Sequence, residues 1–436
     1  MPYKDNLCFI HIPKCAGSSI EHAMDIKEDQ NLKHGKGKRK FTDVHDSYVF
    51  QVQHLTLKQL NEFKVIDTKS MFKFTFVRNP FERMVSEYAW CGKWFPHCEI
   101  YGHEGSTKKG WDTFEEFLEF VYDHVTLYNN TNFIWCHFAP QSWFIKPEEA
   151  DFIGKVENFK EDLQNLSDQS GFTFEHIHVN KRGHKPYQQM YNNHTAELVR
   201  KMYQQDFETF GYDKLAVISH FKEDVAWAKE LVIPYVIYTK GDTELDEFKP
   251  HVVKFGPNLC REASSYTKYI IDNYYTLPDH VCFLQGSRTS WHNDDLVDIL
   301  RRFKWGTRDY ININHNKKYY RSGILLENTK EATCKVYQNS NLHRPQIWEY
   351  FFKELGDPPA DKEWYTYGCA QFVVKKDAIM KHSKQMYVDM YEKMMKCEIA
   401  DSYYTSLIFE HMWGKIFGPL VALEPKIQEH EYLNGV

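Results

Sequence analysis

The first half of the chain alternates short apolar runs with longer amphipathic segments. Runs rich in apolar and β-branched residues predict strands at residues 7–12, 72–77, 151–156 and 176–179. Apolar positions at helical spacing predict helices over residues 19–24, 80–90, 113–125 and 195–210. Strands separated by helices are typical of a parallel sheet covered on both faces. The pattern therefore predicts an α/β domain over residues 1–214.

The alternation starts again after Gly211, which follows the last helical residues as a usual stop signal. Strands are predicted at residues 215–219, 235–238, 281–285 and 371–374, and helices at 223–231, 261–275, 376–395 and 403–416. This second series predicts another α/β domain over residues 215–436.

A loop near the start of the chain has the composition of an anion-binding site. The strand that contains Phe9 runs into Pro13-Lys14-Cys15-Ala16-Gly17-Ser18-Ser19, and a helical pattern follows. Backbone N–H groups in a tight turn before a helix bind anions, and a lysine adds a point charge. In the alternative phosphate loop of nucleotide triphosphatases the lysine follows the second glycine. Here Lys14 precedes Gly17, which disfavours a kinase or ATPase.

A second motif follows the strand at residues 72–77. Arg78 ends that strand, Asn79 and Pro80 suit the N-cap and first position of a helix, and Glu82 suits a capping box. Ser86 is predicted to share a polar helix face with Asn79 and Arg83. Ligands of such sheets bind at the carboxyl ends of the strands. Lys14 and Arg78 are therefore expected to face one ligand that carries two anionic groups.

Together these motifs resemble those of sulfotransferases that use 3′-phosphoadenosine 5′-phosphosulfate (PAPS). The loop around Lys14 is similar to their 5′-phosphosulfate loop, and the stretch from Phe76 to Tyr88 is similar to their 3′-phosphate site. The closest group is the carbohydrate sulfotransferases and their soluble microbial relatives. Further similarity lies in the segments 53–56, 151–158 and 206–212. The resemblance covers residues 1–214 and implies a P-loop-like sulfotransferase fold.

The resemblance also implies residue roles. Lys14 would contact the phosphosulfate and stabilise the departing phosphate, whose product is 3′,5′-adenosine bisphosphate (PAP). The donor-binding residues would be Lys14, Cys15, Ala16, Gly17, Ser18, Ser19, Arg78 and Ser86, with Lys181 and Arg182 as further candidates. Lys181 and Arg182 can equally be read as a solvated turn.

Transfer to a hydroxyl group also needs a general base. His54 is the first choice because its segment resembles the acceptor side of the family; His45, His11 and Glu87 are reserves. Four aromatic residues could line a sugar cleft or simply pack in the core: Trp90, Trp94, Phe95 and Trp111. A carbohydrate or glycolipid acceptor is expected. No metal is expected in the first domain.

The composition narrows the class of protein. The chain has 436 residues, 42% hydrophobic and 26% charged, with a net charge of −6. These values suit a globular protein and disfavour a nucleic-acid partner. Neither a signal peptide nor a membrane anchor is expected, which predicts a cytoplasmic protein. The alternative is one peripheral to a membrane that carries lipid-linked glycans. The oligomeric state is left open.

Residues 215–436 resemble a poorly characterised family whose pattern suggests a glycosyltransferase-like sheet. Metal-dependent enzymes of that type place Asp-x-Asp at a strand end, whereas here the strand ends in Gln285-Gly286-Ser287. Asp294 and Asp295 come later and suit a helix start. The alternative function is glycan assembly, in which this domain is a nucleotide-sugar glycosyltransferase or a glycan-binding module.

Overall fold

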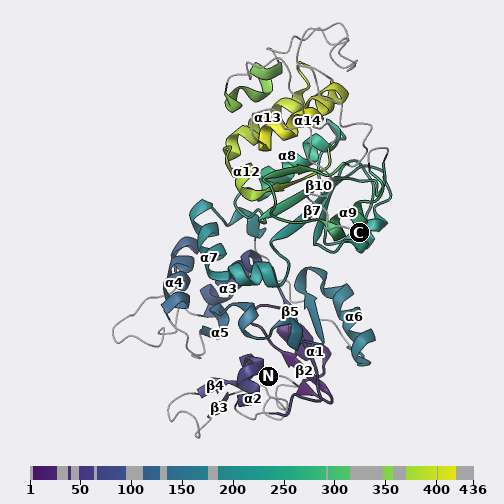
Figure 1. Ribbon diagram of the computed structural model, residues 1–436. Coiled ribbons are helices and arrows are strands. Elements are labelled where there is room, and N and C mark those ends of the chain that lie inside the picture. Colours follow the sequence, from purple (N-terminus) through teal and green to yellow (C-terminus); the bar gives the residue numbers. More distant parts are fainter. Residues whose placement is uncertain are drawn as a thin grey trace. The chain divides into compact units, whose positions relative to one another are not determined.

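The computed structural model contains two compact units, Met1–Tyr212 and Asp213–Val436. It describes residues 3–26, 38–40, 49–62, 66–94, 111–127, 135–174, 185–290, 293–314, 347–356, 370–399 and 401–418. The units meet two residues before the boundary predicted at 214. Figure 1 shows a sheet and its helices in each unit.

The first unit is built on a four-stranded sheet with the order β1-β2-β5-β6. Its strands are β1 (Tyr3–Lys4), β2 (Leu7–Ile10), β5 (Phe72–Val77) and β6 (Phe152–Lys155). β2, β5 and β6 are parallel, and β1 is antiparallel to β2. The predicted α/β class with a parallel sheet is confirmed. The carboxyl ends of β2 and β5 lie side by side.

The helices of this unit are α1 (Gly17–Ala23), α2 (Leu57–Glu62), α3 (Pro80–Trp94), α4 (Phe114–Leu127), α5 (Trp135–Phe138), α6 (Phe159–Ser170) and α7 (Asn193–Thr209). A separate hairpin pairs β3 (Lys38–Lys40) with β4 (Val49–Gln51). The strand predicted at 176–179 lies outside the described residues.

One face of the first sheet is closed by aromatic packing. Phe9 on β2 stacks on Phe74 of β5, with ring centroids 5.1 Å apart. The same buried cluster contains Ile20 of α1, Met24 directly after α1, and Leu163 and Leu166 of α6. A buried side chain of this size contributes about 1.5–3 kcal/mol. The packing fixes α1 and the loop before it on the strand ends.

The second unit contains a six-stranded sheet with the order β11-β12-β10-β7-β8-β9. Its strands are β7 (Lys214–His220), β8 (Tyr235–Thr239), β9 (Val252–Lys254), β10 (His280–Gln285), β11 (Tyr310–Asn312) and β12 (Phe372–Lys375). β10, β7, β8 and β9 are parallel, whereas β12 is antiparallel to both neighbours.

Alternating residues of β10 serve two hydrophobic cores. Val281 and Phe283 pack in a cluster with α8 (Arg261–Asn273), α13 (Lys384–Lys396) and α14 (Ser402–Phe417). Cys282 and Leu284 pack in the other cluster, with α9 (Leu296–Arg302). Both faces of the sheet are therefore covered, as expected of a largely parallel sheet.

Two predicted helices of the second unit are wrong in part. The helix expected at 223–231 is only a 3₁₀ turn, Ala226–Glu230, because the Glu223 carboxylate turns back to the N–H groups of Phe221 and Lys222. The helix expected at 376–395 is divided into α12 (Lys376–Met380) and α13, since the Ser383 hydroxyl caps a new helix at the N–H of Met386.

Candidate active site

The loop between β2 and α1 has the backbone of an anion nest. Lys14 and Ala16 have φ values of 65° and 62°, in the left-handed region, and flank Cys15. Alternating left- and right-handed residues turn successive N–H groups toward one point. The N–H groups of Ala16, Gly17 and Ser18 have no hydrogen-bond acceptor among the described residues. The loop can therefore accept an anion.

Gly17 is required by the ring of His11. A Cβ atom at Gly17 would lie 1.7 Å from His11 Nε2. The ring cannot retreat freely, because His11 Nδ1 donates to Glu21 Oε1 at 2.7 Å and Gln53 Nε2 donates to the same oxygen at 2.7 Å. His11 and Glu21 are both buried. This network connects the loop to the segment that carries His54.

Arg78 meets the same loop from the neighbouring strand end. Its Nη1 donates to the backbone oxygen of Lys14 at 3.3 Å, and its Nη2 pairs with Glu82 Oε1 at 2.8 Å. The buried Nε has no partner among the described residues. The structure thus brings the two sequence motifs into contact and leaves Arg78 a hydrogen-bond donor.

The start of α3 differs from the predicted capping box. Asn79 Oδ1 accepts from the N–H of Phe81, as an N-cap should. Glu82 instead pairs with Arg78, and the Asn79 N–H donates to Glu157 Oε1 at 2.6 Å. Tyr212 holds the other oxygen of Glu157. The Glu157 carboxylate, which follows β6, therefore accepts the hydrogen bond from the Asn79 N–H that Glu82 would accept in a capping box.

Arg83 of α3 is buried by the segments that it hydrogen-bonds. Its side chain is fully buried and donates to the backbone oxygens of Pro13 at 3.2 Å and of Ala139 and His137 at 2.9 Å each. Asn79 and Ser86, with which it is predicted to share a polar face, are half-buried. The guanidinium has several donors in one plane and can satisfy carbonyl groups of two separate segments. Arg83 thus links the backbone just before Lys14 to the backbone of residues 137–139.

The side-chain amide of Gln141 hydrogen-bonds the backbone of Arg78 as a neighbouring β-strand would. Its Nε2 donates to the Arg78 backbone oxygen and its Oε1 accepts from the Arg78 N–H, both at 2.8 Å. The same Oε1 accepts from the thiol of Cys15 at 3.2 Å. The Asp206 carboxylate in turn accepts from the N–H groups of Gln141 and Ser142. Burial raises the pKa of Cys15 to about 12, so this thiol stays protonated as a donor.

His54 lies beside the loop in a defined tautomer. Its Nδ1 lies 3.1 Å from the backbone oxygen of His11, and because a carbonyl oxygen only accepts, Nδ1 carries the proton. The lone pair is therefore on Nε2. Burial, together with the nearby rings of His11 and His137, lowers the pKa of His54 well below 6.5. At neutral pH the ring is uncharged and can accept a proton.

His137 is the residue that sequence reasoning missed. It donates from Nδ1 to the buried Glu87 carboxylate, at 3.1 and 3.2 Å from the two oxygens. Its ring stacks on Trp90 at 4.6 Å, and Lys14 Nζ lies 5.4 Å from the Trp90 ring centroid. Burial alone would raise the pKa of Glu87, but the attraction of His137 and its hydrogen bond lower it. Lone histidines carry no spacing signal, and only the fold places this one here.

The other predicted residues are placed as follows. Ser18 is exposed, Ser19 is buried, and Ser86 on α3 is half-buried. Trp111 packs against Phe117 and Phe120, which supports core packing for that residue. Lys181, Arg182, His45 and Phe95 lie outside the described residues, as does the side chain of Trp94.

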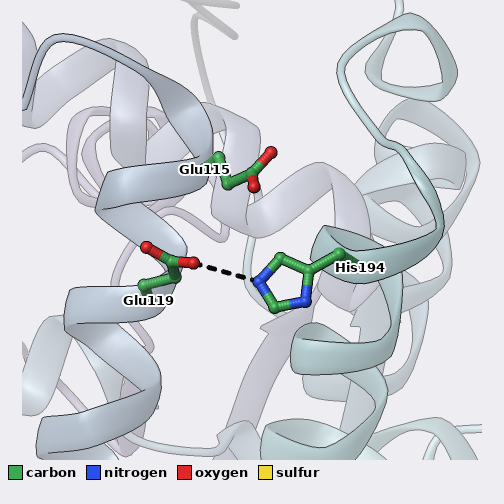
Figure 2. Close-up of side chains that lie close together, drawn as sticks. All are labelled: Glu115, Glu119 and His194. Carbon is green, nitrogen blue, oxygen red and sulfur yellow. Dashed lines mark hydrogen bonds and ion pairs between the residues drawn. The ribbon is translucent and has the colours of Figure 1, made fainter.

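A separate group of metal-ligand types lies on α4 and α7. Figure 2 shows Glu115, Glu119 and His194, all of them exposed. His194 Nε2 pairs with Glu119 at 3.1 Å, and the Asn192 amide donates to Glu115 at 2.9 Å. Each carboxylate thus has a protein partner on the other helix or at its N-cap.

Among the described helices, none is long and apolar enough to cross a membrane.

Comparisons with known proteins agree with this division of the chain. Residues 1–213 match the model of the family described as "Sulfotransferase family". Residues 215–430 match the family described as "Protein of unknown function (DUF3431)". Searches of curated proteins and of solved structures gave no match.

Proposed function

Because residues 1–213 form a domain of the sulfotransferase family, we propose that this domain transfers a sulfuryl group from PAPS to a hydroxyl group of a carbohydrate. The contact between Arg78 and the Lys14 loop is the observation that carries the proposal. It joins two cationic residues, Lys14 and Arg78, at adjacent strand ends. PAPS has two separated anionic groups that these residues could bind. AMP has only one of them.

The described residues suit such a donor. The N–H groups of Ala16, Gly17 and Ser18 have no other acceptor among the described residues and would hold the 5′-phosphosulfate. Ser86 and the Arg78 guanidinium, whose Nε has no partner in the described part of the chain, would bind the 3′-phosphate. Glu82 competes for the same guanidinium, which keeps the affinity for a lone phosphate modest.

Sulfuryl transfer is an in-line displacement in which positioning and charge stabilisation provide most of the acceleration. PAPS would supply the activated sulfuryl group. Lys14 would stabilise the charge that develops on the departing phosphate. His54 would take the proton from the acceptor hydroxyl at Nε2, because its Nδ1 proton is fixed by His11. His137 would hold the acceptor side of the site in place through Glu87 and Trp90.

The pH dependence tests the base. kcat/KM should be level from neutral pH upward and fall only well below pH 6.5, since His54 loses its basic lone pair on protonation and its pKa is lowered. Replacement by Asn keeps a side-chain donor for the His11 oxygen and removes the base. His54→Asn should therefore lower kcat about 10²–10⁴-fold. An unchanged kcat in His54→Asn would assign the base elsewhere.

The donor is tested by ligand-induced stabilisation. PAP should raise Tm much more than AMP at equal concentration, because only PAP has the 3′-phosphate. Arg78→Lys should reduce this difference, since a lysine lacks the planar fork of donors. Equal shifts by PAP and AMP would contradict the 3′-phosphate assignment.

Lys14→Ala should abolish sulfuryl transfer from PAPS to carbohydrate acceptors and leave the fold intact. Lys14 is half-buried and its ammonium lies over Trp90, so its loss opens no large cavity. Lys14→Arg is the matched variant that keeps the charge and should retain part of the rate. Full activity in Lys14→Ala would remove Lys14 from the mechanism.

Nucleotide-sugar transfer by the second domain is the alternative. Its support is the parallel core of the sheet from β10 to β9, flanked by helices on both faces. A panel of nucleotide sugars distinguishes the two functions. Turnover of a nucleotide sugar, with no turnover of PAPS, would favour the alternative.

A further inference from the structure

The strand order of the second unit reverses at one place. The chain runs from β7 to β8 and β9 on one side, and then returns through α8 to β10 on the other side of β7. Ser219 near the end of β7 is the register partner of Gln285 at the end of β10. In open α/β sheets, ligands bind outside the carboxyl ends of the strands where the order reverses.

The first turns of α8 place polar groups along this edge. Ser265 hydrogen-bonds Ser219 of β7 at 2.8 Å, and Ser264 accepts from Lys240, which follows β8, at 3.1 Å. Gln285 at the end of β10 hydrogen-bonds Glu262. Each of three neighbouring strands thus has one polar pair at its carboxyl end. A purely structural contact between helix and sheet would ordinarily use apolar residues.

The backbone at this edge is strained. Cys260 and Arg261 have φ values of 55° and 44° where α8 begins. Two consecutive residues other than glycine in the left-handed region cost about 1–2 kcal/mol each. Such strain concentrates at binding sites.

Described residues on either side of positions 291–292, after β10, are held by ion pairs and hydrogen bonds. Arg288 makes a bidentate pair with Asp295 and a further pair with Glu230. Asp295 caps α9 at the N–H groups of Val297 and Asp298, as expected for a helix start. Ser290 and Asn293 exchange backbone hydrogen bonds at 2.8 and 3.2 Å.

Two neutral polar side chains that follow β10 have no hydrogen-bond partner among the described residues. Asn293 is 2% exposed, yet neither its amide nitrogen nor its oxygen has a hydrogen-bond partner among the described residues. The hydroxyl oxygen of Ser290 is also buried and has no hydrogen-bond partner among the described residues. Buried polar groups almost always have partners, and a native exception calls for one from outside the chain.

We propose that the carboxyl edge of β7 and β10, with Asn293 and Ser290, is a binding site for a neutral, hydroxyl-rich ligand, a saccharide. Two cations of this edge are already engaged. Lys240 is hydrogen-bonded to Arg261 and Ser264, and Arg288 is paired with two carboxylates. A carboxamide and a hydroxyl each donate and accept, and therefore complement sugar hydroxyls.

The proposal does not depend on sulfuryl transfer by the first domain, and the test keeps the two apart. The full chain is applied to an array of defined neutral oligosaccharides and compared with Asn293→Leu. The wild type should bind, and the variant should bind at least about 10-fold more weakly, since ligand hydroxyl groups lose their partners. Binding that survives in Asn293→Leu would belong to another site. It would overturn the proposal, as would an array without any bound saccharide or binding confined to phosphorylated sugars.

Thermal unfolding without ligand gives an independent readout. Asn293→Leu keeps the side-chain size and removes two unpaired buried groups, so Tm should rise by roughly 2 °C or more. The matched control is Asn273→Leu. The Asn273 amide donates to Tyr269 at 2.9 Å, and the control should lower Tm. A lower Tm in Asn293→Leu would show that Asn293 has a partner within the protein and would overturn the proposal. Ser290→Ala should behave as Asn293→Leu does in both assays.

Discussion

A single methyl group at Gly17 tests how the anion loop is held. In Gly17→Ala the new Cβ would lie 1.7 Å from His11 Nε2, 2.2 Å from Cδ2 and 2.3 Å from Cε1, whereas ordinary contacts begin at 3.4 Å. The ring must therefore move by well over an ångström. It is buried, and its bond to Glu21 is 2.7 Å long. Overpacking of this kind costs about 1–3 kcal/mol.

The expected loss is read from Tm and from PAP binding. Each kcal/mol lowers Tm by about 2–4 °C in a domain of this size. PAP binding should weaken as well, because the ring and the anion loop move together. Ser18→Ala, at the exposed neighbour, is the matched control and should leave Tm unchanged.

The decisive comparison is a double-mutant cycle with His11→Ala. Removing the ring opens the space that the methyl group needs. Gly17→Ala should then cost little in that background. An equal loss in both backgrounds would refute the steric explanation.

Three further predictions concern other parts of the chain. Arg83→Met leaves three carbonyl groups, two of them buried, without their donor, and should lower the free energy of unfolding in urea by about 3 kcal/mol or more. Burial lowers the pKa of Lys240 from 10.5 to about 8, so the unfolded chain holds this proton more tightly. The stability of the wild type relative to Lys240→Met should therefore rise between pH 8 and pH 10.5, by about 3 kcal/mol at most; a flat difference would contradict the shift. Dialysis against EDTA should leave Tm unchanged, because Glu119 and His194 pair with each other; a loss that zinc restores would make them metal ligands.

The strands and the two motifs could be predicted because their signals are local. The strand at 72–77 and the helix that begins at Pro80 agree with the structure at those bounds. Apolar periodicity and helix-start residues act within a few positions of each other. The same holds for the loop around Lys14, whose composition alone indicates an anion site.

The partners of the motifs could not be predicted from the sequence. The spacing of Arg83 predicts a polar helix face shared with Ser86, but not that its guanidinium hydrogen-bonds carbonyl groups far along the chain. His137 on α5 reaches the site through its contacts with Glu87 and Trp90. Such contacts depend on tertiary placement, for which a single sequence contains no spacing rule.

The clamp formed by Gln141 and Asp206 has a consequence for synthesis of the chain. Both motifs are complete once the ribosome has passed residue 86, but the backbone of Arg78 is held by Gln141, and Gln141 is held by a carboxylate on α7. A nascent chain that ends before α7 contains the whole of both motifs without the carboxylate that holds this clamp. The clamp on the Arg78 backbone is therefore complete only when the first domain is almost fully translated.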